Sequence, residues 1–422
     1  MMGRDNIMAW VWMTRYGRDA GKGAVFGANS LSTHMGYGMT IEQGGANLDA
    51  HWDKTYKTNL GIDMRIIQNK MSVNLDIYKD RGREIFASYQ GEAGYPFTVG
   101  VKPVPENFAE LDTWGFELSL GWKDKIGKNF SYWAKLSTGY TDNKVKKAAQ
   151  IANPDRDDLV VGKRKDMGQW GYSCIGMFRS YQDIEEYFDR YLKKDDGTYG
   201  TYLGLTKDGV HPGMLIYRDV NGAWDTDKRQ YDPNPDHQVD ENDMVRISKF
   251  SSNPYGVTLN FGGAYKSFSF SAQLGASWGS YDFVPGTVQK SANNMEYYNI
   301  PDFWKDMYVY EDVIGADGKV IAAANRNGEI PNMRYTSVNA QQSTYWKVSN
   351  AELSLTQVAL AYDLPKQWMN PIGISSARIN VTCQNAINFI TPHYKDAWSS
   401  WGGNYGYYPQ LRKLTVGVNV SF

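Results

Sequence analysis

The last nine residues of the chain, Leu414 to Phe422, constrain its fold more than any other feature. They alternate strictly between apolar and small or polar residues, and they end on an aromatic residue. This is the two-residue period of a β-strand with one apolar face. An alternating strand at the open edge of a soluble sheet invites edge-to-edge association, whereas a closed transmembrane barrel has no open edge. The ending therefore favours a lipid-facing barrel strand.

The same alternation recurs in four earlier pairs of strands. The pairs are 59–66 with 71–77, 114–122 with 130–140, 255–261 with 268–278, and 358–362 with 379–383. Segment 7–16 is a further candidate strand. The turns inside each pair are short, whereas the connections between pairs are long: about 80–107, 145–250, 279–344 and some twenty residues before the last strand. Outer-membrane barrels combine short periplasmic turns with long extracellular loops, so we expect a periplasmic C-terminus.

Charged residues of these strands fall almost only on the polar phase of the alternation, as Asp63, Asp76, Glu117 and Lys135 do. A Lys or Arg on the lipid face would cost ~2–4 kcal/mol near the membrane midplane. The predicted fold is all-β, namely nine or ten strands of a large antiparallel transmembrane barrel. Transporters with a plugged lumen have about 22 strands, so we expect the chain to be the C-terminal part of one.

The predicted division has a poorly defined segment at 1–53, with one strand and an extracellular loop, and the C-terminal half of the barrel at 54–422. The N-terminus carries Arg4 and Asp5 and has no apolar core, so we do not expect it to be a signal peptide. We therefore expect a fragment that starts at an internal methionine.

Composition excludes several classes. The net charge of −1 argues against a nucleic-acid partner, and no apolar run is long enough for a membrane-spanning helix. The five histidines are scattered, and the spacings of metalloproteases, serine hydrolases and P-loops are missing, so we expect no enzyme. Cys174 and Cys383 have no metal or redox spacing.

Seven stretches together resemble the SusC/RagA-like TonB-dependent outer-membrane transporters of Bacteroidetes. Leu48 to Asp63 (LDAHWDKTYKTNLGID) resembles the family's "NPDLKWEKT…NIGLD" stretch, without its usual Asn-Pro. The others are Trp114 to Leu118 ("GFEL"), Thr141 to Val145 ("YNKNKV"), Gly176 to Phe178 ("GIF"), Tyr362 to Pro365, Ile374 to Asn385 and Tyr408 to Phe422. Their order and spacing run from about residue 45 to the end.

The resemblance implies energised import of oligosaccharides or peptides. It implies a SusD-like surface lipoprotein as a lid, outer-membrane lipid around the barrel, and a TonB-ExbB-ExbD complex that pulls on an N-terminal plug. We expect no plug segment within these residues and therefore no transport by them alone. Two alternatives from other classes are a soluble all-β glycan-binding protein or hydrolase, and a passive porin.

Aromatic residues in the long connections are candidate substrate contacts, because flat rings pack on the C–H faces of sugars. These candidates are Trp398, Trp401, Tyr405, Trp304 and Tyr308. The alternative is an interfacial aromatic girdle. Phe422 is a candidate assembly signal, since barrel strands that end on an aromatic residue are recognised during insertion.

Two further stretches carry candidate features. Asp219 and Asn221 resemble the start of a calcium loop, and Asp240 and Asp243 resemble its end, but about eight extra residues separate the halves. A structural Ca²⁺ competes here with a solvated Asp/Asn turn cluster, and we expect no other cofactor. Ser180, three residues before Asp183, predicts a capped helix that docks a partner or packs within its own loop.

Overall fold

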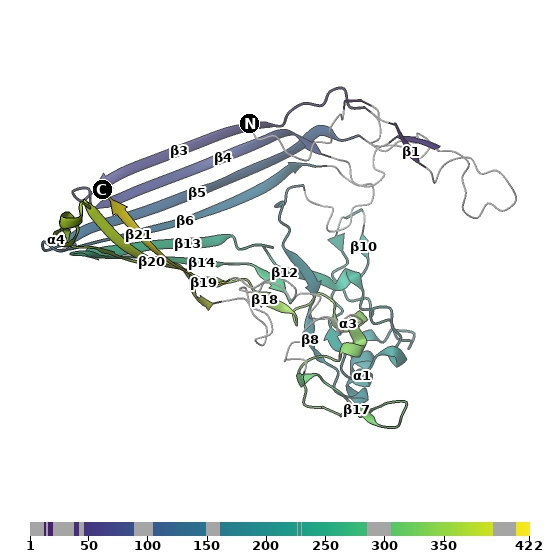
Figure 1. Ribbon diagram of the computed structural model, residues 1–422. Coiled ribbons are helices and arrows are strands. Elements are labelled where there is room, and N and C mark those ends of the chain that lie inside the picture. Colours follow the sequence, from purple (N-terminus) through teal and green to yellow (C-terminus); the bar gives the residue numbers. More distant parts are fainter. Residues whose placement is uncertain are drawn as a thin grey trace.

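The computed structural model describes residues 12–13, 16–19, 38–41, 46–87, 104–148, 161–225, 227–228, 230–284, 305–390 and 411–422. Its largest element is a nine-stranded antiparallel sheet in the order β21-β20-β19-β14-β13-β6-β5-β4-β3 (Figure 1). The strands are β3 (Lys54–Ile66), β4 (Met71–Ala87), β5 (Glu106–Ile126), β6 (Phe130–Lys147), β13 (Tyr255–Tyr265), β14 (Phe268–Trp278), β19 (Glu352–Asp363), β20 (Ser376–Ile390) and β21 (Lys413–Ser421).

This sheet confirms the four predicted strand pairs and the final strand. Tight turns join the pairs, with left-handed backbone at Asn69 (φ 63°), Gly127 (φ 64°) and Lys266 (φ 52°). The fourth turn contains α4 (Lys366–Met369) and the 3₁₀ turn η9 (Asn370–Ile372). All four turns lie at one end of the sheet, and the long connections leave from the other end (Figure 1).

Several strands run further than the alternation predicts. β4 continues ten residues past the predicted end at 77, to Ala87, and β6 continues to Lys147. The extra residues place charged side chains such as Lys79, Arg81 and Lys144 on the phase that is apolar further down. The alternation of apolar and polar residues therefore ends where the strands leave the apolar band of the sheet, although the hydrogen bonds between the strands continue.

The two faces of the sheet differ in polarity, because side chains alternate across a strand. One cross-strand row on the first face joins Ile77, Phe116 and Tyr140, and these residues follow the predicted lipid phase. The neighbouring row on the opposite face joins Asp76, Glu117 and Gly139. Register is thus fixed by solvent preference, since a slip of one residue would exchange the faces.

Aromatic side chains form a band at each end of the apolar face. At the loop end, the Tyr140 and Tyr255 rings stack 5.6 Å apart, and Trp278 lies 6.2 Å from Tyr255. At the turn end, the Phe268 and Tyr362 rings lie 4.5 Å apart. Ten residues separate Phe268 from Trp278 on β14, or roughly 33 Å along the strand and about 25 Å along the axis of a tilted barrel. This is the height of the apolar band of an outer-membrane barrel.

The two longest connections fold together into one body beside the loop end of the sheet, which we call the loop unit (Figure 1). It is built from residues 161–248 and 305–349. Its elements are β7 (Gln169–Tyr172), β8 (Cys174–Met177), α1 (Tyr181–Tyr187), the π-helical turn η3 (Phe188–Leu192), η4 (Lys207–Gly209), β9 (Leu215–Tyr217), β10 (Trp224–Asp225), β11 (Gln230–Tyr231), η5 (Glu241–Asp243), β12 (Met244–Ser248), β16 (Val313–Ile314), β17 (Val320–Ala322), η8 (Met333–Tyr335), α3 (Thr336–Asn339) and β18 (Lys347–Ser349). β18 pairs with β15 (Tyr281–Phe283).

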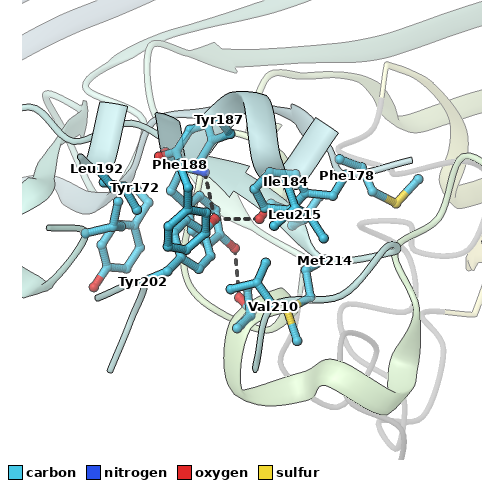
Figure 2. Close-up of a cluster of buried hydrophobic side chains, with 14 of the residues drawn as sticks. Tyr172, Phe178, Ile184, Tyr187, Phe188, Leu192, Tyr202, Val210, Met214 and Leu215 are labelled. Carbon is cyan, nitrogen blue, oxygen red and sulfur yellow. Dashed lines mark hydrogen bonds between the residues drawn. The ribbon is translucent and has the colours of Figure 1, made fainter. Parts of the chain in front are cut away.

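The buried core of the described chain lies in the loop unit rather than in the sheet. Fully buried Phe178, Phe188 and Tyr202 belong to one buried cluster (Figure 2). The same cluster contains Val338 from the second connection. The Tyr202 hydroxyl donates to the carbonyl of Leu215 at 2.6 Å and accepts the N–H of Tyr217 at 2.9 Å. The sequence predicts one capped helix within these long connections, and the structure shows that they also hold a buried core of their own.

Little of the first 53 residues is described. β1 (Tyr16–Asp19) pairs with β2 (Gly38–Ile41), and β3 begins at Lys54. Most of the predicted strand at 7–16 lies outside the described residues, and the division at residue 53 stays a prediction. Within the described ranges, no helix has the length and apolar character needed to cross a membrane.

Candidate functional site

A polar groove of about 800 Å³ lies on the face of the sheet opposite the apolar one. Its central row runs from Asp76 and Glu117 across Gly139 and Gly256 to Ser277 and Glu352. Gly139 and Gly256 leave the middle of this row without side chains. The groove forms there because the carboxylate side chains of Glu117 and Glu352 project from the sheet on either side of the two glycines.

Hydroxyl and amide groups line the next row of the groove. Asn74, Ser119, Ser137 and Thr258 follow one another across four strands, and the Ser119 and Ser137 hydroxyls hydrogen-bond at 3.1 Å. Among the described residues that line it, Lys135 is the single cation, and Asp76, Glu117 and Glu352 supply three carboxylates. Such a surface can hydrogen-bond hydroxyl-rich or amide-rich ligands and prefers cationic over anionic ones.

Only part of this groove is predictable from the sequence. Asp76, Glu117, Ser119 and Lys135 fall on the predicted polar phase, whereas Glu352 lies outside the predicted strands. The polar phase of each strand is visible in the sequence, whereas the register that brings six strands into one groove depends on turn geometry and bulges.

Tyr78 stiffens the loop end of the same face. Its ring lies across Gly115 of β5, and its hydroxyl hydrogen-bonds the hydroxyl of Thr141 on β6. A Cβ atom on Gly115 would lie 2.6 Å from the Tyr78 hydroxyl and 2.3 Å from the Tyr140 carbonyl oxygen. Glycine is therefore required where the aromatic ring crosses the strand.

The helix expected after Ser180 is present in the loop unit. Ser180 caps α1 through the N–H of Asp183, and the Asp183 carboxylate accepts the N–H of Ser180, which is a complete capping box. The buried face of this helix carries Ile184 and Tyr187 into the core of the loop unit. Packing within its own loop therefore accounts for its apolar face, and docking of a partner stays a prediction.

Tyr308 lies in the interior of the loop unit. Its side chain is 0% exposed, and its hydroxyl donates to the carbonyl of Arg179. The Arg179 guanidinium lies 5.1 Å from the ring centroid. In this structure the ring packs against the protein and is not presented to a ligand. The other aromatic candidates, Trp304, Trp398, Trp401 and Tyr405, lie outside the described residues.

The structure brings the two separated acidic stretches together. The Asp243 carboxylate, which is fully buried, accepts the N–H groups of Val220 and Asn221 at 2.6 and 3.0 Å, and that of Asp240 at 2.9 Å. Asp219 accepts the N–H of His237 at 2.8 Å. The extra residues between the halves therefore do not separate them in space.

These carboxylates are held as acceptors for backbone groups. Burial and the neighbouring Asp243 charge raise the pKa of Asp219 to about 6, and burial also raises the pKa of Asp243. The Oδ1 atom of Asp240 accepts the N–H of Asn242, and the Asn221 amide donates to the carbonyl of Asn242. In the described part of the chain, no group of three or more His, Cys, Asp or Glu side chains is placed to hold a metal ion. The calcium site stays a prediction.

Phe422 follows the last residue of β21 and is 89% exposed. Val418, on the apolar phase, pairs with Ile379 of β20, and Thr415, on the opposite phase, pairs with Thr382. Cys383 also falls on the apolar phase, opposite Leu414. The assembly role of Phe422 is not tested by this geometry.

Comparison with known proteins finds relatives of the chain among TonB-dependent receptors. No family model matches the chain. The TonB-dependent receptor P3 of Formosa agariphila is 21% identical over 99% of the chain, and the TonB-dependent receptor SusC of Bacteroides thetaiotaomicron is 19% identical over 89%. Among solved structures, the RagAB peptide transporter matches 100% of the chain with a TM-score of 0.65 and 16% identity.

The chain is homologous to the SusC/RagA-like TonB-dependent receptors. This confirms the predicted resemblance and the predicted class of strand-rich membrane fold. The relatives are outer-membrane receptors and transporters, which fits a chain that is not an enzyme. The chain spans 40% of the length of receptor P3, 32% of SusC and 40% of the matched RagAB chain. The nine-stranded sheet matches the barrel region of the RagA chain.

Proposed function

We propose that the chain is part of an outer-membrane, TonB-dependent active importer of oligosaccharides or peptides. The observation that carries the proposal is the sheet itself: nine strands with one apolar face between two aromatic bands and one polar face with a groove. A sheet with this polarity suits a barrel wall that faces lipid outside and a hydrated lumen inside. The homologous receptors and the RagAB peptide transporter support the importer class.

The orientation follows from the two ends of the sheet. The tight turns would lie in the periplasm, and the loop unit would lie outside the cell, as long loops do in bacterial barrels. The C-terminus would then be periplasmic. The loop unit is the part best placed to receive a SusD-like lipoprotein lid, and a TonB-ExbB-ExbD complex would act through a plug contributed by the rest of the protein.

Substrate contacts are proposed at two places. The groove supplies carboxylate and hydroxyl groups such as Glu117 and Ser137, which hydrogen-bond sugar hydroxyls and peptide groups equally well. Trp398 and Trp401, with Tyr405 and Trp304, would supply stacking surfaces. The groove does not decide between oligosaccharides and peptides.

Uptake by the full-length protein tests the proposal. Cells that express it with its lipoprotein partner should accumulate labelled oligosaccharide or peptide, and accumulation should stop when the proton gradient is collapsed or TonB is removed. Uptake that persists without TonB would favour the passive porin. A chain that is folded and monodisperse in plain buffer would favour a soluble glycan-binding protein.

The aromatic contacts are tested separately. Trp398→Ala with Trp401→Ala should lower uptake while the amount of inserted barrel stays constant. Unchanged uptake would assign these rings to an interfacial girdle instead.

A further inference from the structure

A cluster of cations stands on the lipid-facing phase of the sheet, beyond the loop-end aromatic band. It consists of Lys79 and Arg81 on β4 and Lys144 and Lys146 on β6, and we call it the rim cluster. All four side chains are exposed. Neither the similarity to TonB-dependent receptors nor the transport proposal gives these residues a role.

The register places the cluster on one surface. Arg81 pairs with Asp112 of β5, and Asp112 pairs with Lys144, so these three residues share one row. Neighbouring strands lie about 4.8 Å apart, which puts the Arg81 and Lys144 backbones about 10 Å from one another. Lys79 lies two residues before Arg81 on β4, and Lys146 lies two residues after Lys144, at the bulge in the pairing of β5 with β6. Both act electrostatically on Asp112.

The acidic groups of this surface already have partners. Arg83 contacts Asp112 at 2.7 Å and Glu110 at 3.5 Å. Asp142 is paired with Arg164 from the loop unit. Among the described residues, none of the four rim cations forms an ion pair with a carboxylate. The surface therefore carries excess positive charge that is exposed to solvent.

The position of the rim cluster along the barrel axis determines which layer of the membrane its positive charge contacts. The rim residues lie two to six positions beyond the row of Ile77 and Tyr140, which is about 7–20 Å along the strand and about 5–15 Å along a barrel axis tilted by ~40°. The headgroup layer is roughly 5–8 Å thick on each side of the hydrocarbon core. Lys79 thus reaches the headgroups, and the other three cations lie at and just above them.

We propose that the rim cluster binds the phosphate groups of a phosphorylated glycolipid in the outer leaflet. Acyl chains would pack on the apolar face below, which is continuous with the cluster along β4, β5 and β6, and phosphates would sit among the cations above. Juxtamembrane cations attract anionic headgroups in this way. The leaflet, though not the chemistry of the contact, rests on the orientation given in the proposed function.

The test uses the full-length protein, purified in detergent, with bisphosphorylated lipid A as the probe. Native mass spectrometry measures the fraction of protein that retains the lipid. We expect retention at least tenfold tighter than for the same lipid without phosphates, and little competition from an equal concentration of inorganic phosphate. Equal retention of the dephosphorylated lipid, or full displacement by inorganic phosphate, would overturn the proposal.

The variant Lys79→Gln, Arg81→Gln, Lys144→Gln and Lys146→Gln should lose at least tenfold in retention. The matched control removes as many cations from the turn end of the sheet, at Lys123, Lys125, Lys128 and Lys366, and should retain the lipid. An equal loss of lipid retention in the rim variant and in the control variant would contradict the proposal, because it would show that any group of basic residues near the membrane binds the lipid. If the quadruple variant does not insert, the two strand-wise double variants give the same comparison.

This outcome is separable from the transport proposal. Retention is measured on purified protein and needs no TonB. Uptake without glycolipid retention would remove only the rim assignment, and retention without uptake would remove only the importer.

Discussion

The hydroxyl of Tyr78 on β4 reaches the hydroxyl of Thr141 on β6 by crossing β5 at Gly115. The bridge ties three strands together at the loop end of the groove. Because the missing side chain of Gly115 makes the crossing possible, Gly115→Ala should destabilise the folded barrel by about 1–3 kcal/mol, as overpacking does. Thermal unfolding of the purified protein measures this.

The double variant Gly115→Ala with Tyr78→Ala separates the two contacts. Truncating Tyr78 relieves the clash with the ring, but the Tyr140 carbonyl, 2.3 Å from the added Cβ, belongs to the backbone and cannot move aside. We therefore expect only partial recovery. Full recovery would show that the ring alone requires glycine.

The buried carboxylate of Asp243 should be a stability determinant of the loop unit. Asp243→Ala would leave the N–H groups of Val220, Asn221 and Asp240 without their acceptor, at a cost of about 2–4 kcal/mol. Limited proteolysis between residues 161 and 248 should speed up in this variant. Asp227→Ala, at an exposed position, serves as the control and should change nothing.

Cys174 should react slowly with alkylating reagents. Burial raises the pKa of its thiol to about 11, so at pH 8 almost none of it is thiolate. In a Cys383→Ser background, alkylation at pH 8 should be at least about tenfold slower in the folded protein than in denaturant, and should accelerate as the pH approaches 11. Equal rates in both states would contradict the buried environment of the thiol.

The final strand tests the assignment of faces. Val418→Asp places a charge on the lipid phase, while Thr415→Asp places one on the lumen phase. We expect outer-membrane levels of the full-length protein to fall strongly with Val418→Asp and little with Thr415→Asp, because charge on the lipid face is costly near the membrane core. An equal fall in outer-membrane levels for Val418→Asp and Thr415→Asp would show that the lipid-facing and lumen-facing sides of the strand are assigned wrongly.

Removal of Phe422 tests the proposed assembly signal. The residue is 89% exposed here, so it contributes few contacts within this sheet. Its deletion should therefore lower the amount of inserted protein far more than the melting temperature of the molecules that do insert. A large drop in melting temperature would give Phe422 a structural task instead.

The membrane sheet was largely predictable because its signal is local. Lipid-facing positions such as Leu118 and Val418 carry apolar residues because they contact lipid. The alternation along the sequence, together with the short turns, therefore predicts the strands and their order. The strand ends were missed at Lys79 and Lys144, where the backbone ladder continues but the solvent changes. The capping box at Ser180 is equally local and was found.

The loop unit was not predictable by the same means. Its core contains Phe178 and Tyr202 together with Val338, which lies more than a hundred positions further along the chain. No periodic pattern in the sequence indicates such a contact. Tyr308 shows the consequence: among loop residues it looks like a stacking platform, yet it is buried between the two connections. Composition shows that aromatic residues are abundant and does not show which of them face inward.

The lipid exposure of β5 offers the most direct measurement. Nitroxide labels placed one at a time from Phe116 to Leu120, in the full-length protein reconstituted into bilayers, report collisions with oxygen, which partitions into lipid. Collision rates should peak at Phe116, Leu118 and Leu120 and fall at Glu117 and Ser119. Rates without a two-residue period, or with maxima at Glu117 and Ser119, would contradict a barrel wall whose apolar face meets the membrane.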